Sequence, residues 1–152
     1  MRVSGLRGFT LIELAVVVVI IGILCGVALP RLVSMEKDAR AAVASSLYHS
    51  LRSSANMIYT KVAAAGQLAN ASYDVDIGGG VTINARYGYP NTDSDENIRS
   101  LFEDLSPRVT VGGGGTTRIL MIDGRPDCGV SYTRAANPGD RAMIEPPDVS
   151  GC

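Results

Sequence analysis

The sequence predicts an α+β fold in which one long N-terminal helix packs on a small antiparallel sheet. Three observations support this prediction. The chain opens with an unbroken apolar run, which is followed by apolar positions at steps of three and four residues. Short segments of alternating apolar and polar residues come later, between turns rich in glycine and proline. Two cysteines, Cys128 and Cys152, lie in this polar part.

The apolar run extends from Phe9 to Leu29. As a helix it would rise about 31 Å, which is enough to cross the hydrocarbon core of a bilayer. Basic residues occur on both sides of it, so the charge bias does not set its orientation. Pro30 follows directly, and we expect it to kink or locally open the helix, because proline lacks an N–H and clashes with the preceding turn.

The helix is predicted to continue on the far side of Pro30 with a single apolar stripe. Its positions are Leu32, Met35, Ala39, Val43, Leu47, Leu51, Ala55, Ile58 and Val62. Gly66 is a plausible stop. We therefore expect one bent helix from Phe9 to Ala65, about 85 Å long. The second half is amphipathic, so it needs a sheet packed against one side.

The remaining segments supply that sheet. Residues 81–87 alternate as a half-buried strand does, and residues 92–106 predict a short helix with cap-competent residues at its start. Four further strands are predicted in "RVTV", "TRILMI", "CGVSYTR" and "RAMIE", separated by "GGGG", "DGRPD" and "AANPGD". These connections are short, so the sheet is expected to be an antiparallel meander.

The cysteines differ in context. Cys25 lies inside the apolar run and is interpreted as a packing residue. Cys128 and Cys152 have no histidine or further cysteine at metal-ligand spacing, so we interpret them as a disulfide, which implies an oxidising compartment outside the cytoplasm. Free thiols in a reducing cytoplasm are the alternative. A disulfide here would contribute about 3.5 kcal/mol in the chain-entropy model.

A single acidic residue, Glu13, stands near the head of the apolar run. A carboxylate in hydrocarbon is costly and calls for a functional reason. Three kinds of processing compete. A secretory signal would be cut after Ala28, but Glu13 argues against it. A lipoprotein signal fails because Leu24 precedes Cys25 where a small residue is needed. The third kind of processing cuts after Gly8 and keeps the helix.

The segment "RGFTLIEL" carries a specific resemblance. It resembles the cleavage and methylation motif of type IV prepilins, of the type IVa class. The resemblance implies that a prepilin peptidase cuts between Gly8 and Phe9 and N-methylates Phe9. It also implies that Glu13 meets the Phe9 amine of a neighbouring subunit, which would fix register. We assign assembly roles to Gly22 and Gly26, a GxxxG step, and to Pro30 as well.

The resemblance divides the chain into a leader, an assembly helix and a globular part. We expect the leader at 1–8, the transmembrane and assembly helix at 9–30, and the globular part at 31–152, made of a helix half (31–65), a connecting region (66–107) and strands with the disulfide-bounded end (108–152).

The function that the resemblance implies is that of a major pilin. It would be stored in the inner membrane as a single-pass protein and assembled into a surface filament for attachment, with motility and DNA uptake as the other functions of such filaments. The implied partners are further copies of the chain, the prepilin peptidase, an inner-membrane platform protein, an assembly ATPase and a secretin. The alternatives are a pseudopilin of a type II secretion system, which usually lacks such a disulfide, and a secreted soluble domain. Through "ARYGYP" and the final "SGC", the chain is also similar to pilins of the mannose-sensitive haemagglutinin type.

No other residue pattern predicts an enzyme, a metal or a cofactor. His49 lacks the partners of a catalytic triad. The acids at 74, 76, 93, 95 and 96 do not follow an EF-hand pattern and suit turns and caps. The net charge of −1 gives no argument for nucleic acid, and the basic residues are interspersed with acids, so nucleic-acid binding stays open. These basic residues are Arg31, Lys37, Arg40, Arg52 and Lys61.

Overall fold

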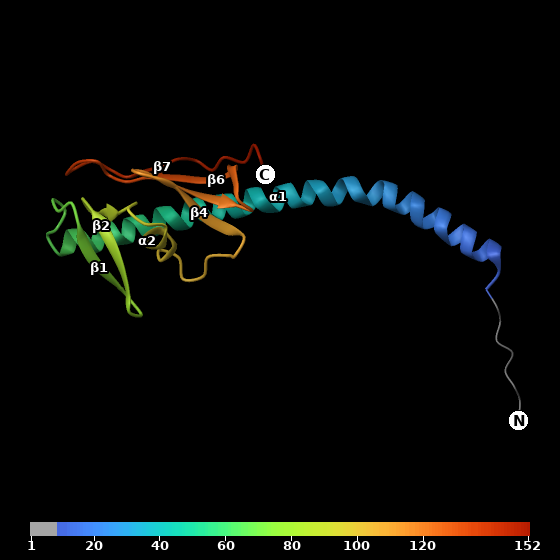
Figure 1. The fold of residues 1–152 in the computed structure, drawn as a ribbon, viewed down its shortest axis with the longest axis horizontal. Helices are drawn as coiled ribbons and strands as arrows, with labels where there is room; N and C mark the ends of the chain where they lie inside the picture. The colour runs from blue at the N-terminus through green and yellow to red at the C-terminus, as the bar shows by residue number, and fades with distance from the viewer. Residues whose placement is uncertain (1–8) are drawn as a thin grey trace, which may run out of the picture. The chain divides into compact units, whose positions relative to one another are not determined.

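The computed structural model describes residues 9–152, except for the side chains at positions 29, 30 and 33. Gly8, one side of the predicted cleavage site, therefore lies outside the described residues. Contacts divide the chain into two units, one ending at Lys37 and one spanning Asp38–Cys152. The second unit is called the head from here on. The order of the elements can be followed in Figure 1.

The first element is helix α1, Leu11–Ala64. The prediction of a helix over 9–65 is confirmed to within two residues. The helix runs through residue 30 without interruption, so the local opening expected at Pro30 is not found. Proline removes only one hydrogen bond of the ladder, and the flanking turns retain theirs. The helix ends where Gly66 has φ +69°, with the N–H of Gln67 bonded to the carbonyl of Val62, a Schellman arrangement.

The strands form two antiparallel sheets. The first contains β1 (Tyr73–Gly78), β2 (Val81–Arg86) and β3 (Tyr89–Pro90) in that order. The second contains β4 (Val109–Gly114), β5 (Thr117–Ile122), β6 (Arg125–Thr133) and β7 (Met143–Ile144), also in chain order. The predicted meander is thus confirmed for the last four strands. Between β3 and β4 the chain forms a short helix, α2 (Asp95–Arg99), whose N-terminus is capped by the Ser94 hydroxyl.

The sequence reasoning missed one sheet. It expected a single sheet and treated the residues before Val81 as a connection, whereas β1 pairs with β2 from Tyr73↔Ala85 to Gly78↔Val81. The alternation was present in "YDVDIG", but its two aspartates suggested a turn. The glycine run was also misplaced, because Gly112 to Gly114 extend β4 and pair with β5. Only Gly115 remains for the turn.

The core of the head lies between α1 and both sheets. From α1 it takes Leu47, Leu51, Ile58 and Val62, which are at most 8% exposed. The sheets contribute side chains from β1, β2, β5 and β6, namely Val75, Ile83, Leu120, Val130 and Tyr132. The earlier stripe positions are different: Leu32, Met35 and Val43 are exposed. In the head, Ala44 rather than Val43 is buried, so the covered stripe begins there.

Polar contacts join the two sheets. The Tyr132 hydroxyl on β6 donates to the carbonyl of Pro90 on β3 at 2.7 Å. The Asn97 side chain on α2 donates to the carbonyls of Asn84 and Asn91, both at 2.8 Å. Asn91 and Thr92 are buried, and Thr92 donates in turn to the carbonyl of Gly115. Since buried polar groups need partners, this cluster fixes how the β1–β3 sheet lies on the rest of the head.

Candidate functional site

The first candidate site is the apolar segment of α1, which belongs to the unit that ends at Lys37. Leu11–Ala28 has a mean hydropathy of 2.9, and none of it is buried within the molecule. Within the described residues it is the one helix long and apolar enough to cross a membrane. Large side chains here are widely exposed, from 44% for Val17 to 87% for Leu11. An apolar surface of this kind requires lipid or other helices around it.

Glu13 is held by the residue three positions before it. Its Oε2 accepts from both the N–H and the hydroxyl of Thr10, each at 3.0 Å. The Thr10 hydroxyl also accepts from the N–H of Glu13 at 3.3 Å. Reciprocal bonds between Thr and a Glu three residues later form a capping box, which satisfies N–H groups that a helix start leaves open. The sequence reasoning missed this role, although the Thr-x-x-Glu spacing carries the signal.

The other residues predicted for assembly lie along the same segment. Phe9 and Glu13 share a shallow depression with Ile12, Val16 and Val17. At Gly22 and Gly26, an added Cβ would meet nothing within 4 Å, so both glycines leave open lateral surface on the helix. The side chain of Pro30, the fifth residue predicted for assembly, is not among those that the structure describes. The structure therefore places Phe9 and Glu13 together and presents the glycines outward.

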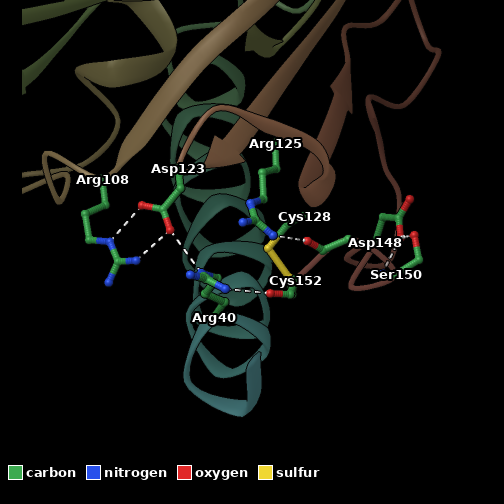
Figure 2. The surroundings of a disulfide bond; sticks show 9 residues. Arg40, Arg108, Asp123, Arg125, Cys128, Asp148, Ser150 and Cys152 are labelled. Atoms are coloured by element: carbon green, nitrogen blue, oxygen red, sulfur yellow. Dashed lines mark hydrogen bonds and ion pairs between the residues drawn. A yellow bond between two sulfur atoms is a disulfide. The ribbon is translucent and has the colours of Figure 1, made fainter. Parts of the chain in front are cut away.

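The second candidate site is the disulfide-bounded end of the head. Cys128 and Cys152 form the predicted disulfide, with Cα atoms 4.9 Å apart. Both are buried, Cys128 completely, and both belong to the core. Cys25 is a free, exposed cysteine of the apolar segment. The bond thus joins β6 to the end of the chain that lies beside it, as Figure 2 shows.

Two arginines converge on one carboxylate next to this disulfide. Asp123 accepts from Arg108 Nε at 2.8 Å and from Arg40 Nε at 3.0 Å (Figure 2). Arg40 Nη1 also donates to the main-chain oxygen of Cys152 at 2.8 Å. Hydrogen bonds from Arg108, aided by those from Arg40, lower the pKa of Asp123 to about 2. Sequence reasoning did not foresee this cluster, because its residues lie far apart in the chain.

The terminal segment carries further polar contacts. Arg125 Nη1 donates to the carbonyl of Gly151 at 2.9 Å. Asp148 accepts from the N–H and the hydroxyl of Ser150, and these bonds lower the pKa of Asp148 (Figure 2). Residue 148 also forms two backbone hydrogen bonds with Gly129. The segment is therefore anchored at several points besides the disulfide.

Several of the residues weighed as metal, catalytic or nucleic-acid candidates have structural contacts. His49 is exposed and lies edge-on to Tyr48. Asp74 accepts a hydrogen bond from Asn84, and Asp76 accepts one from the N–H of Gly78. Asp93 accepts hydrogen bonds from Asn91 and Arg134. Asp95 forms an ion pair with Arg118. Lys61 donates to the carbonyl of Asp76. Within residues 9–152, no group of three acidic, histidine or cysteine side chains is arranged to hold a metal ion.

Comparisons with known proteins bear on both sites. Residues 5–29 match the family model described as the prokaryotic N-terminal methylation motif. The chain is also similar to the type IV narrow pilus major component PilA5 of Thermus thermophilus, with 36% identity over 116 residues. That alignment covers 76% of this chain and 95% of the relative. No solved structure gives a significant match. The similarity to the mannose-sensitive haemagglutinin type is not tested by these matches and stays a prediction.

Proposed function

We propose that this chain, which belongs to the type IV pilin family, is the major structural subunit of a type IV pilus. The observation that carries the proposal is the exposed apolar segment Leu11–Ala28. Lipid covers such a surface before assembly, and the same segments of other copies cover it in a filament. Small residues such as Gly22 and Gly26 let helix backbones approach closely in that setting.

Processing by a prepilin peptidase follows from the motif. We expect cleavage after Gly8 and N-methylation of the new terminus at Phe9, both of which fall within the matched residues 5–29. Methylation leaves the amine cationic. The mature subunit would then start with a positive charge four residues before Glu13.

Register in the filament would come from Glu13. In the free chain its Oε2 accepts both Thr10 donors, and no hydrogen bond to Oε1 is found among the described residues. We propose that the carboxylate accepts from the Phe9 amine of a neighbouring copy while the capping box stays in place. An opposite charge stabilises a carboxylate in a low-dielectric bundle, whereas a carboxylate without that partner is costly there.

The location and the remaining partners are part of the same proposal. The subunit would span the inner membrane once, with the head on the oxidising side, as the Cys128–Cys152 disulfide requires. A platform protein, an assembly ATPase and a secretin would act on it. We assign it no catalytic activity and no cofactor, because the role of a filament subunit rests on packing and needs neither.

Mass spectrometry of the mature chain tests the proposal. Fibres sheared from the cell surface are expected to contain a chain that starts with N-methyl-Phe9. A start at Leu29 would instead favour a secreted domain whose signal is removed after Ala28. A correctly processed chain that never appears in surface fibres would favour a pseudopilin, which shares the motif. The disulfide and the match to a pilus component over most of the chain argue for the pilin.

A further inference from the structure

A cleft of about 740 Å³ opens in the head, and none of the residues that line it belongs to the apolar segment of α1 or to the cluster around Asp123. One wall is the α1 stretch from Tyr48 to Tyr59. The second wall is the hairpin that joins β2 to β3, and the third is the segment 139–144, which leads into β7. All three walls belong to the head of a single subunit. The volume lies in the range of small-molecule sites.

Tyrosine rings line two of the three walls. Four of the six tyrosines in the chain line the cleft, namely Tyr48, Tyr59, Tyr87 and Tyr89. The rings of Tyr59 and Tyr89 lie 5.0 Å apart with planes inclined by 32°. Tyr87 has φ +50°, an uncommon conformation for an aromatic residue, and its N–H bonds to the carbonyl of Asn70. The guanidinium of Arg86 lies 4.8 Å from the Tyr87 ring centre. These contacts fix the rings as a preformed surface.

Two arginines without an ion pair among the described residues also line this cleft. Arg52 on α1 and Arg141 on the third wall form no ion pair with any residue in 9–152. Other arginines of the head do pair with carboxylates: Arg40, Arg108, Arg118 and Arg134. Burial and the neighbouring Tyr59 raise the pKa of the Tyr89 phenol, and the charge of Arg141 opposes that rise. Like charges around one concavity favour an anionic ligand between them.

The polar groups beside these cations narrow the class of ligand. Asn56 offers both a donor and an acceptor, and Asp140 offers a carboxylate whose Oδ2 is already taken by Asn137. A carboxylate in the wall accepts well from hydroxyl groups, which a saccharide carries on every unit. Guanidinium groups bind a carboxylate in a fork geometry. Tyrosine faces suit the apolar face of a sugar ring.

We propose that this cleft binds an acidic saccharide, with Arg52 and Arg141 on its carboxylate and the tyrosine rings against its ring face. The inference goes beyond the proposed role as a filament subunit and does not depend on it, since one head supplies every group. The cleft is open to solvent, so a single site binds weakly. Copies repeated along a filament would raise the apparent affinity by avidity.

Binding to the unpolymerised full chain in detergent micelles tests this directly. The probes are a hexamer of galacturonic acid and the same hexamer as its methyl ester, which keeps the shape and removes the charge. Titration calorimetry is expected to show binding of the acid and at least about tenfold weaker binding of the ester. Arg52→Gln and Arg141→Gln are each expected to weaken binding of the acid by about tenfold. Lys37→Gln removes a cation from the same helix outside the cleft, so it serves as the matched control.

Several outcomes would overturn the assignment. The first is equal affinity for the galacturonic acid hexamer and its methyl ester. The second is no detectable binding of the acid hexamer at about 10 mM. The third is a loss of affinity for the acid hexamer in Lys37→Gln that is as large as the loss in Arg52→Gln. Tighter binding of a single-stranded oligothymidylate than of the hexamer would assign the cleft to nucleic acid instead. Unchanged thermal transitions of the variants establish that the head stays folded. Because the measurement uses unpolymerised chain, failure here is distinct from failure to form fibres.

Discussion

The Nε of Arg40 on α1 lies 3.0 Å from Oδ2 of Asp123 in the turn between β5 and β6. The same guanidinium donates through Nη1 to the main-chain oxygen of Cys152. One helical side chain therefore contacts both a hairpin turn and the residue that closes the disulfide. Arg40 is largely covered, with a side-chain exposure of 13%, so this contact is screened less than a surface pair. It links the helix to the end of the head.

The first prediction concerns Asp123 and pH. The folded head holds the pKa of Asp123 at about 2, below the usual 3.8, because Arg108 and Arg40 stabilise the anion. The resulting stabilisation is fully present above about pH 4 and is lost as the pH falls through 2. Asp123→Asn is therefore expected to lower the melting temperature at pH 6, and the difference from the wild type is expected to be much smaller at pH 2.

The control for this prediction is Asp104→Asn, which changes an exposed carboxylate on the same head. It is expected to leave the melting temperature unaltered at either pH. Asp148 also has a lowered pKa, but it is present in every variant and cancels in the difference. If Asp123→Asn melted as far below the wild type at pH 2 as at pH 6, the ion pairs of Asp123 would not be the source of the lost stability.

The second prediction concerns the disulfide. Cys152→Ser is expected to destabilise the head by about 3.5 kcal/mol in the chain-entropy model, because the bond closes a loop with a sequence separation of 24. Urea unfolding under oxidising conditions measures this. The matched control is Cys25→Ser, which alters a free and exposed cysteine outside the head. Reductant is expected to lower the stability of the wild type to that of Cys152→Ser. Equal stability of the wild type and Cys152→Ser under oxidising conditions would contradict the prediction.

The periodicity of the chain predicts much of this fold. The steps of Leu47, Leu51, Ile58 and Val62 identify the covered face of α1, because a helix buries one stripe. The alternation and short turns of the last four strands likewise predict their order. The β1–β3 sheet was missed because β1 carries aspartates at its exposed positions, where turn and strand chemistry look alike.

The clusters that hold the head together could not be predicted from local patterns. Arg40 and Asp123 are 83 residues apart, and the Tyr132 hydroxyl reaches a carbonyl 42 residues away. Such pairs depend on how elements pack, and periodicity contains no information on that. The capping box of Thr10 and Glu13 is a different case, since both residues and their spacing are local.

The third prediction concerns a glycine in the β5–β6 ladder. A Cβ at Gly129 would lie 2.0 Å from the carbonyl oxygen of Leu120, which is backbone and cannot turn aside. Gly129→Ala is expected to cost about 1–3 kcal/mol or to prevent folding, because overpacking forces strands apart. Gly114→Ala is the control, since its Cβ would meet nothing within 4 Å. Thermal melts and the yield of folded chain measure both variants, and similar losses in the two would refute the steric reason.

The last prediction separates the two roles of Glu13. Glu13→Gln keeps an amide oxygen that can accept from the N–H and hydroxyl of Thr10, so the capping box survives while the charge is removed. If the carboxylate pairs with the Phe9 amine of a neighbour, this variant is expected to insert into the membrane normally and to yield far fewer sheared fibres. Glu13→Leu is expected to behave similarly, because it too lacks the charge.

Thr10→Val is the complementary variant, because it removes the hydroxyl contacts and keeps the charge of Glu13. Its fibre yield is expected to stay much closer to that of the wild type, since the ion pair between subunits is retained. Immunoblots of membrane and sheared fractions measure insertion and polymerisation separately. Loss of fibres in Thr10→Val together with normal fibres in Glu13→Gln would reverse the argument, because helix capping rather than charge pairing would then control assembly.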